Sequence, residues 1–212
     1  MDIEAAARTR PPGRGPKVRA AVLAATLSEL AQAGYASLTV ENVARRAGVH
    51  KTTVYRRWKT REDLVADAVA DLAAAQVPFP DTGDIGADLH SLALSFVRLM
   101  NSPAGRAIAA ATLSDAGRIP EIDQAKRHFF ADRFQRAAPI VAGAITRGEL
   151  PAGTDPAELI KTLIAPIYLR LLVTAEPISD ATAATAVAIT MAAARAGALA
   201  PQPAPPPAHA TQ

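Results

Sequence analysis

Cysteine is absent from this chain of 212 residues, which excludes disulfide bonds, thiolate metal sites and cysteine nucleophiles. Aromatic residues make up only 4% of the sequence, and β-branched runs and hairpin dipeptides such as Asn-Gly are scarce. No run of about 18 uninterrupted apolar residues occurs, so we expect no membrane-spanning helix. The arginines near the N-terminus precede no apolar segment, which predicts a cytoplasmic protein without a signal peptide.

Alanine dominates the hydrophobic half of the sequence, and it is the best helix former. Apolar residues at helical spacing, with proline and glycine stops between them, predict an all-α chain. Gly34 is expected to end the first helix, and Pro166 to kink the eighth. Thr39 and Thr60 are expected to cap the second and fourth helices. The sequence predicts about nine helices, covering residues 17–33, 40–47, 51–58, 61–76, 84–101, 104–116, 121–147, 155–174 and 180–197.

Basic residues are concentrated at the N-terminal end. Residues 1–61 hold 12 of the 23 Lys and Arg but only 4 of the 20 Asp and Glu, a balance of +8 against −5 for the rest. This asymmetry favours a module that binds a polyanion, although a solvated basic face would give the same balance. We expect the Pro- and Gly-rich residues 1–15 to form a flexible basic arm and the Pro/Ala-rich residues 199–212 a disordered tail.

The segment 39–59 has the pattern of a helix-turn-helix. Two short helices are expected to meet at a tight turn on Gly48, with the small Ala44 at their closest approach. The seam between them would be filled by Val43, Val49 and Val54. The second helix keeps an outer face of cations, hydroxyl groups and one aromatic ring, which suits the major groove of DNA. An ordinary helical hairpin with a basic surface is the alternative interpretation.

Spacing within and just beyond this segment carries a more specific signal. The residues concerned are Thr39, Val43, Ala44, Ala47, Gly48, Val49, His50, Thr53, Tyr55, Trp58, Arg61 and Leu64. In this order and spacing they resemble the signature of the TetR/AcrR family of transcriptional regulators, and the resemblance covers residues 17 to about 70. Trp58 replaces the usual phenylalanine and is expected in the core. His50 replaces the usual serine, and its imidazole could still accept a capping bond or touch a phosphate.

The resemblance implies that this module binds double-stranded DNA. The residues expected at the DNA are Thr39, His50, Lys51, Thr52, Thr53, Tyr55, Arg56 and Lys59, together with Arg14 and Lys17 at the end of the arm. Thr39 and Lys59 would hold phosphates, and Tyr55 would pack against the DNA backbone. Arginines separated by Gly and Pro in the arm would suit a narrow minor groove, with a solvated tail as the alternative.

The resemblance further implies a DNA-binding domain over residues 16–60 and a helical ligand-binding and dimerisation domain over residues 61–198. The last two long helices would pair with their copies in a homodimer, although their apolar stripes would equally fit a core within one chain. The residues expected at this interface are Ile160, Leu163, Ile164, Ile167, Leu171, Ala184, Val187, Ala188 and Met191. The residues expected around a ligand are Phe96, Met100, Phe129, Phe130, Phe134 and Tyr168, each of which could instead be core.

Enzyme motifs are missing from the sequence. The histidines do not form a zinc-binding pair with a glutamate, and no serine elbow or Gly-rich phosphate loop occurs. Asp84, Asp88 and His90 could imitate a metal site, but acids at a helix start are better explained as caps. We expect no cofactor, no metal and no enzymatic activity. The expected function is a repressor that a small, mostly apolar ligand releases from a palindromic operator. The alternatives are an architectural DNA-binding protein and an enzyme of unknown type.

Overall fold

The computed structural model describes residues 14–113 and 120–201, and within these ranges the only regular elements are helices. The expected all-α fold is therefore confirmed. The helices are α1 (Arg14–Ser37), α2 (Val40–Ala47), α3 (Lys51–Arg57), α4 (Arg61–Gln76), α5 (Ile85–Asn101), α6 (Pro103–Leu113), α7 (Pro120–Thr146), α8 (Pro156–Tyr168) and α9 (Asp180–Arg195). A π-helical segment, Leu169–Val173, continues α8. None of the described helices is long and apolar enough to span a membrane.

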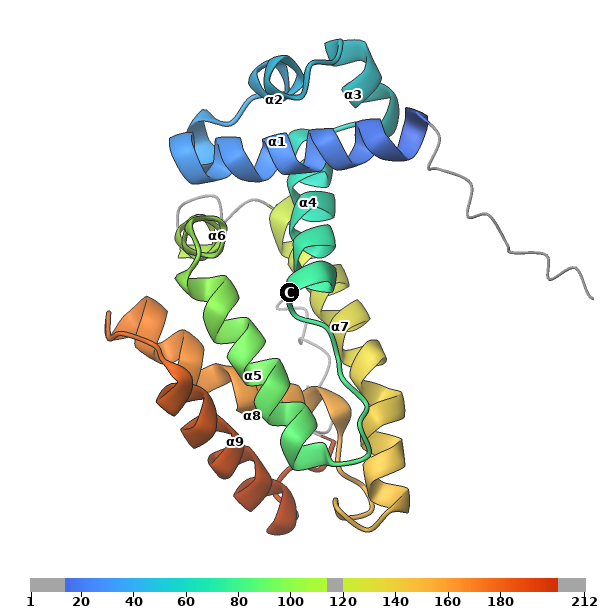
Figure 1. Ribbon diagram of the computed structural model, residues 1–212, viewed down its shortest axis with the longest axis vertical. Coiled ribbons are helices and arrows are strands. Elements are labelled where there is room, and N and C mark those ends of the chain that lie inside the picture. Colours follow the sequence, from blue (N-terminus) through green and yellow to red (C-terminus); the bar gives the residue numbers. More distant parts are fainter. Residues whose placement is uncertain (1–13, 114–119, 202–212) are drawn as a thin grey trace, which may run out of the picture.

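Two bodies are joined by α4 (Figure 1). At the top, α1 lies crosswise with α2 and α3 above it, and α4 descends from beneath α1 into the lower body. The lower body contains α5, α7, α8 and α9, while α6 lies directly under α1. Each body has its own cluster of buried apolar side chains, and α4 contributes Leu64 and Ala68 to the upper cluster.

The upper core explains why the short helices α2 and α3 are stable. Val43 and Val54 are completely buried between them, and Ala44 is 3% exposed, as their predicted place in the seam requires. Val49 is only partly buried, but it packs against the same cluster. Helices as short as α2 and α3 are unstable in isolation, so this packing on α1 and α4 holds them in place.

The predicted helix boundaries mostly agree with the structure. Thr39 accepts a hydrogen bond from the Asn42 N–H, and Thr60 forms a reciprocal capping box with Asp63. Helical geometry in α1 is interrupted at Gly34, where φ is 75°. However, α1 begins at Arg14 rather than near residue 17, so it includes the end of the predicted arm. A proline in the first helical turn loses no hydrogen bond, so Pro16 does not delay the start of α1.

The eighth helix differs from its prediction. It does not run unbroken from 155 to 174, because the α-helix ends at Tyr168 and a π-helical segment follows. There the N–H of Thr174 bonds to the carbonyl of Leu169, five residues back. Pro166 has no N–H for the α-helical ladder, but the Leu169 N–H still bonds to the Ala165 carbonyl, so the wider turns begin only after the proline. Ala175 lies beyond this segment in the left-handed region, with a φ of 53°.

The C-terminal end also needs a correction. Leu199 was expected to begin a disordered tail, but its side chain is 7% exposed and its carbonyl accepts a hydrogen bond of 2.7 Å from the Asp155 N–H. An apolar side chain that fits a gap in the lower core is stabilised by leaving water. The predicted arm up to residue 13 and the tail beyond residue 201 lie outside the described residues, as does the predicted end of the sixth helix at 114–116.

Candidate nucleic-acid interface and ligand cavity

A tight turn sets the angle between α2 and α3. Gly48 adopts the left-handed conformation with φ 67°, and its N–H bonds to the carbonyls of Ala44 and Arg45 at the end of α2. Glycine adopts this conformation without the steric penalty of a Cβ atom. The turn leads directly into α3, so one face of α3 packs on the upper core and the other faces outward.

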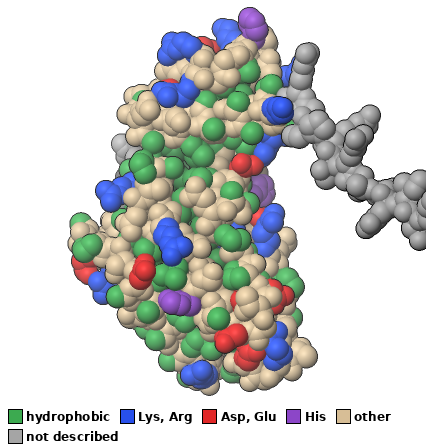
Figure 2. Space-filling model, viewed as in Figure 1, with side chains coloured by type: hydrophobic (Ala, Val, Ile, Leu, Met, Phe, Trp, Pro, Cys, Tyr) green, Lys and Arg blue, Asp and Glu red, His purple; other side chains and the backbone are tan. Residues whose placement is uncertain are grey.

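The outward face of α3 collects most of the predicted DNA-binding residues. Exposed side chains on or beside α3 are His50, Lys51, Thr52, Tyr55, Arg56, Arg57 and Lys59. Tyr55 is 41% exposed, an unusual position for a large ring, whereas Thr53 is half-buried against the module. Figure 2 shows that Lys and Arg side chains gather over α2 and α3 at this end of the molecule. The surface therefore combines cations with hydroxyl groups and one exposed ring.

The remaining predicted DNA contacts surround this face. Thr39 and Lys17 are exposed at the starts of α2 and α1, and Arg14 is the first residue of α1. His50 occupies the N-cap position of α3, but its side chain makes no capping hydrogen bond. Its imidazole is thus left available to a partner outside the module. The sequence prediction omitted three exposed cations, Arg45, Arg46 and Arg57, which the concentration of positive charge alone could have indicated.

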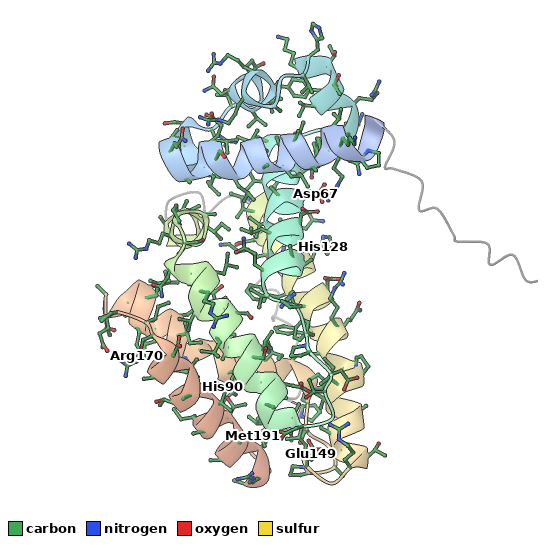
Figure 3. The ribbon with its side chains drawn as sticks, in the orientation of Figure 1. Asp67, His90, His128, Glu149, Arg170 and Met191 are labelled. Atoms are coloured by element: carbon green, nitrogen blue, oxygen red, sulfur yellow. The ribbon has the colours of Figure 1, made fainter. Side chains whose placement is uncertain are left out.

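Polar contacts fix the module on α4. The Trp58 indole N–H donates to Asp67 at 2.9 Å, and Arg19 of α1 forms ion pairs of 2.6 Å with Asp67 and Asp71. Figure 3 places Asp67 on α4 just below α1. Trp58 is 6% exposed, so the tryptophan lies in the core as predicted. Hydrogen bonds from Arg19 to Asp71 and Asp67 raise the pKa of the guanidinium. These contacts link α4 to α1 and to Trp58 at the end of α3.

A second contact joins the end of α1 to the start of α4. The Tyr35 hydroxyl donates to Glu62 at 2.8 Å, and the Arg61 guanidinium lies 4.4 Å from the centre of the Tyr35 ring. Burial, reinforced by the negative Glu62 carboxylate, raises the pKa of Tyr35 to about 12. Tyr35 therefore stays a neutral donor under physiological conditions. On the opposite side Arg46 pairs with the mostly buried Glu29 at 2.6 Å, which ties α2 to α1.

The lower body contains a cavity of about 80 Å³, measured as the space open to water-sized molecules. That space has room for several water molecules, since one water molecule needs on the order of 10–15 Å³ by this measure. The cavity is lined by Val69, Leu72, Ala73, Val77, Phe79, Leu92, Phe96, Leu99, Met100, Ile108, Phe129, Phe130, Arg133, Ile160, Ile164 and Tyr168. All the aromatic and methionine residues predicted for a ligand site are in this lining except Phe134, which stacks on Phe130 with ring centres 5.9 Å apart.

The cavity is in contact with the elements that carry the upper body. Val69, Leu72 and Ala73 bring α4 to its wall, and Ile108 of α6 lines it as well. Ile108 also packs against the upper core, as do its neighbours on α6. A molecule in the cavity would therefore touch two helices on which the helix-turn-helix rests.

The predicted dimer interface is only partly consistent with the structure. Ile160, Leu163 and Ile167 are at most 6% exposed, so these three assignments are wrong for a subunit contact. They point into the lower core, because the face of α8 that carries them packs against neighbouring helices of the same chain. Partly buried members of the predicted set are Ile164, Leu171, Val187 and Met191, all packed against the lower core. Ala184 and Ala188 of α9 are exposed.

Large apolar side chains that the prediction missed are also exposed in this part of the lower body. Leu169 is 53% exposed, Val173 71% and Ile189 49%. Leu169 and Val173 lie in the π-helical segment that continues α8, and Ile189 lies on α9, which packs against α8. Exposed apolar side chains of this size on adjoining helices are typical of an interaction surface. Helical periodicity could not separate these positions from the core positions, because both are apolar.

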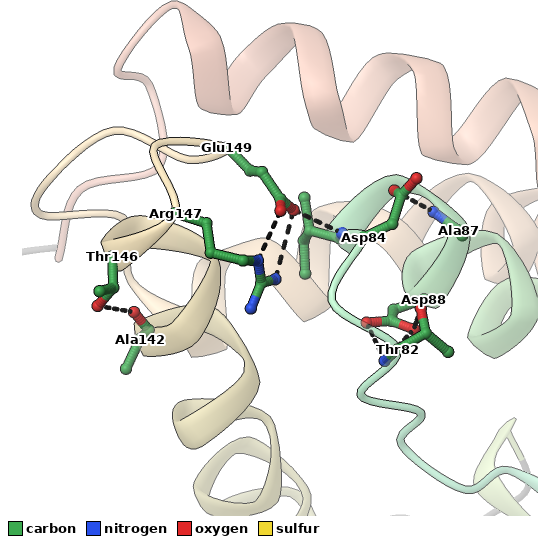
Figure 4. Close-up of polar contacts among 9 residues, drawn as sticks. Thr82, Asp84, Ala87, Asp88, Ala142, Thr146, Arg147 and Glu149 are labelled. Atoms are coloured by element: carbon green, nitrogen blue, oxygen red, sulfur yellow. Dashed lines mark hydrogen bonds and ion pairs between the residues drawn. The ribbon is translucent and has the colours of Figure 1, made fainter.

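The acidic residues at the start of α5 act as structural groups. Asp84 caps α5 by accepting from the Ala87 N–H at 2.9 Å, as expected. Asp88 is buried and accepts hydrogen bonds from the backbone N–H and the hydroxyl of Thr82 (Figure 4). The Glu149 carboxylate accepts a hydrogen bond from the Ile85 N–H. Within residues 14–113 and 120–201 no group of three or more His, Asp or Glu side chains could hold a metal ion.

Family models match most of the chain. Residues 22–68 match the model described as "Bacterial regulatory proteins, tetR family", and residues 79–190 match "Tetracyclin repressor-like, C-terminal domain". The first match ends within α4 and the second begins at residue 79 in the α4–α5 connection, so they correspond largely to the upper and lower bodies. The first model spans the helix-turn-helix, which identifies the exposed face of α3 as part of a DNA-binding domain.

Individual proteins agree with this assignment. The HTH-type transcriptional regulator AqdR of Rhodococcus erythropolis is 36% identical over 168 residues, covering 78% of this chain and 81% of AqdR. The DNA-binding transcriptional repressor TetR of Mycobacteroides abscessus is 28% identical, covering 79% and 88% of the two chains. The crystal structure of the TetR family transcription regulator SCO0332 superposes with a TM-score of 0.68 at 34% identity, covering 83% of this chain and 97% of that one. The chain belongs to the TetR family of transcriptional regulators.

Proposed function

We propose that the protein is a homodimeric repressor that holds a palindromic operator through its two α3 helices and is released by a small, mostly apolar ligand. The observation that carries this proposal is the outward face of α3, where Lys51, Tyr55 and Lys59 are exposed on a helix fixed by its own core. Such a helix fits the major groove, and flanking cations neutralise phosphates. A regulator of this kind works beside the chromosome, so the proposal includes a cytoplasmic location.

The homodimer follows from the amount of DNA that one module can read. A single α3 contacts few base pairs, whereas a two-fold dimer reads two half-sites about 34–36 Å apart. The exposed Leu169, Val173 and Ile189 supply an apolar surface for the second copy. Alanines 184 and 188, exposed on the same helix as Ile189, would let two helices approach closely.

Release by a ligand is supported by the position of the cavity. A ligand there would contact α4 and α6, and Trp58 and Arg19 connect α4 to the helices above. Binding that favours one orientation of α4 changes the spacing of the two α3 helices and lowers affinity for the operator. The repressor mode is further supported by the name of the similar Mycobacteroides abscessus protein, a transcriptional repressor.

The test is a mobility shift, titrated with salt, on DNA that flanks the protein's own gene, with scrambled DNA as the comparison. Lys59→Ala should weaken binding about tenfold and reduce the salt slope by about 2 for the dimer, because each subunit loses a phosphate contact. Tyr55→Ala should also weaken binding but leave the slope unchanged, because no charge is lost. Arg136→Ala is the matched control, since Arg136 is an exposed cation on α7 in the lower body.

Each outcome discriminates between the functions considered. Tight binding to one palindromic site, lost in the α3 variants and kept in Arg136→Ala, would establish the operator-binding repressor. Equal binding to both DNAs that modest salt abolishes would instead favour an architectural DNA-binding protein. Normal operator binding by both Tyr55→Ala and Lys59→Ala would contradict the assignment of α3 as the recognition helix.

A further inference from the structure

The cavity contains one cation in a lining that is otherwise almost entirely apolar. Of the described lining residues, only Arg133 and Tyr168 carry a side-chain N–H or O–H group. The rest are aliphatic, methionine or phenylalanine side chains, with Phe96 meeting Tyr168 edge-on at 5.1 Å between ring centres. A guanidinium in such a lining is expensive to dehydrate unless an anion or several hydrogen-bond acceptors compensate it.

The contacts of Arg133 within the chain compensate it only in part. One N–H donates to the Val77 carbonyl at 2.6 Å, and the guanidinium lies 4.1 Å from the centre of the Phe79 ring. Among the described residues no carboxylate pairs with it, because the neighbouring Asp132 is paired with Arg136 at 2.7 Å. Burial lowers the pKa of Arg133, and the nearby Arg136 cation lowers it further. A guanidinium has five N–H donors, so most of its donors are available to a ligand.

We propose that the cavity binds a planar aromatic acid whose carboxylate pairs with Arg133 and whose ring packs among the aromatic side chains of α5 and α7. This proposal rests on the proposed function, since it assigns the chemical class of the effector. Phe129 and Phe130 precede Arg133 by one helical turn on α7, so the two phenyl rings and the guanidinium line the same cavity. A flat ring with a carboxylate at its edge satisfies both kinds of lining group.

The same guanidinium connects the ligand to α4. Val77 is the C-cap residue of α4, and its carbonyl accepts the hydrogen bond from Arg133. A carboxylate that draws the guanidinium toward itself therefore acts directly on the lower end of the helix that carries the DNA-binding module. A neutral ligand in the same cavity would fill space but would lack this connection.

Calorimetric titration at neutral pH compares 1-naphthoate with 1-naphthamide, which have the same ring system and differ in charge. The wild-type protein should bind the acid at least tenfold more tightly than the amide. Arg133→Gln should abolish this preference by weakening binding of the acid alone, and Arg133→Lys should retain part of it. Arg127→Gln makes the same exchange at an exposed position of the same helix outside the cavity and should behave as wild type. Octanoate, an acid without a ring, should bind more weakly than naphthoate.

Several results would overturn the inference. These are equal binding of acid and amide to the wild type, an acid preference that survives in Arg133→Gln, octanoate binding more tightly than naphthoate, or no binding of either naphthalene compound at millimolar concentration. The wild-type comparison needs no variant, so the inference stays testable if Arg133→Gln does not fold. Operator binding without any probe is measured separately. Its absence beside a clear acid preference would refute the repressor and leave the cavity assignment intact.

Discussion

Gly105 lies where the chain turns from α5 into α6, and a side chain there has no room. A Cβ atom on Gly105 would be 2.0 Å from the Leu99 carbonyl oxygen and 2.9 Å from the Met100 Cα. These neighbours are backbone atoms, which cannot move aside as the end of a flexible side chain can. Leu99 and Met100 both line the cavity, so this close approach also shapes the cavity wall.

Gly105→Ala is expected to lower the free energy of unfolding by about 1–3 kcal/mol, the usual cost of forcing extra atoms into a packed site. Urea unfolding followed by circular dichroism measures the change. Gly143→Ala is the control, because a Cβ there would meet only the end of the Arg147 side chain at 3.1 Å. It replaces glycine inside α7 and should stabilise the protein by up to about 1 kcal/mol. Equal stabilities of the two variants would contradict the proposed crowding at Gly105.

Among the elements, α4 has the most consequential position. Its first turns belong to the upper core through Leu64 and Ala68, and its later turns line the cavity through Val69, Leu72 and Ala73. Because one helix has both roles, the proposed release by a ligand would act through a displacement of its lower end. Its start is held by the capping box of Thr60 and Asp63, with hydrogen bonds of 3.0 and 3.2 Å.

Removing this cap tests how firmly α4 is anchored. Thr60→Ala leaves the Asp63 N–H without its acceptor and should destabilise the protein by about 1 kcal/mol. Thr60→Ser keeps the hydroxyl acceptor and should retain most of the wild-type stability. Thermal unfolding of the three proteins at equal concentration provides the comparison. A serine variant as unstable as the alanine variant would show that the threonine methyl group, and not the cap, matters at this position.

For the whole molecule, the exposed apolar side chains at the end of the α8 region and on α9 predict that two copies of the chain form a dimer through this surface. A double variant, Val173→Glu with Ile189→Glu, places charges at two positions that are 71% and 49% exposed in the single chain. A single chain tolerates charge at such positions, whereas a dimer interface must bury it unpaired. Sedimentation analysis should therefore show a folded monomer that binds the operator far more weakly than the wild type.

Gln135→Glu is the control for this experiment, because it adds charge at an exposed position of α7. That variant should sediment as the wild-type dimer and bind the operator normally. A double variant with the dimer mass and unchanged affinity would place the interface elsewhere.

Local signals in the sequence were sufficient to predict the helices and the DNA-binding module. Caps such as Thr39 and Thr60, the turn glycine Gly48 and the valine seam act over a few residues, so the printed order of residues already determines them. The same locality explains the wrong prediction for α8. Pro166 signalled an irregularity in this helix, but the π-helical segment that follows it depends on how residues after the proline pack. The resemblance to the family also rested on this local spacing.

The tertiary structure alone decided the roles of the side chains in the lower body. An apolar stripe predicts that one side of a helix is shielded from water. It does not predict whether the core, a cavity or a second chain covers that side. Ile160, Leu163 and Ile167 proved to be core residues, while Val173 and Ile189 face outward. Arg133 gave no signal in the sequence, because its significance comes from the residues that α4, α5 and α8 bring around it. Those neighbours are distant in the chain, and only packing brings them together.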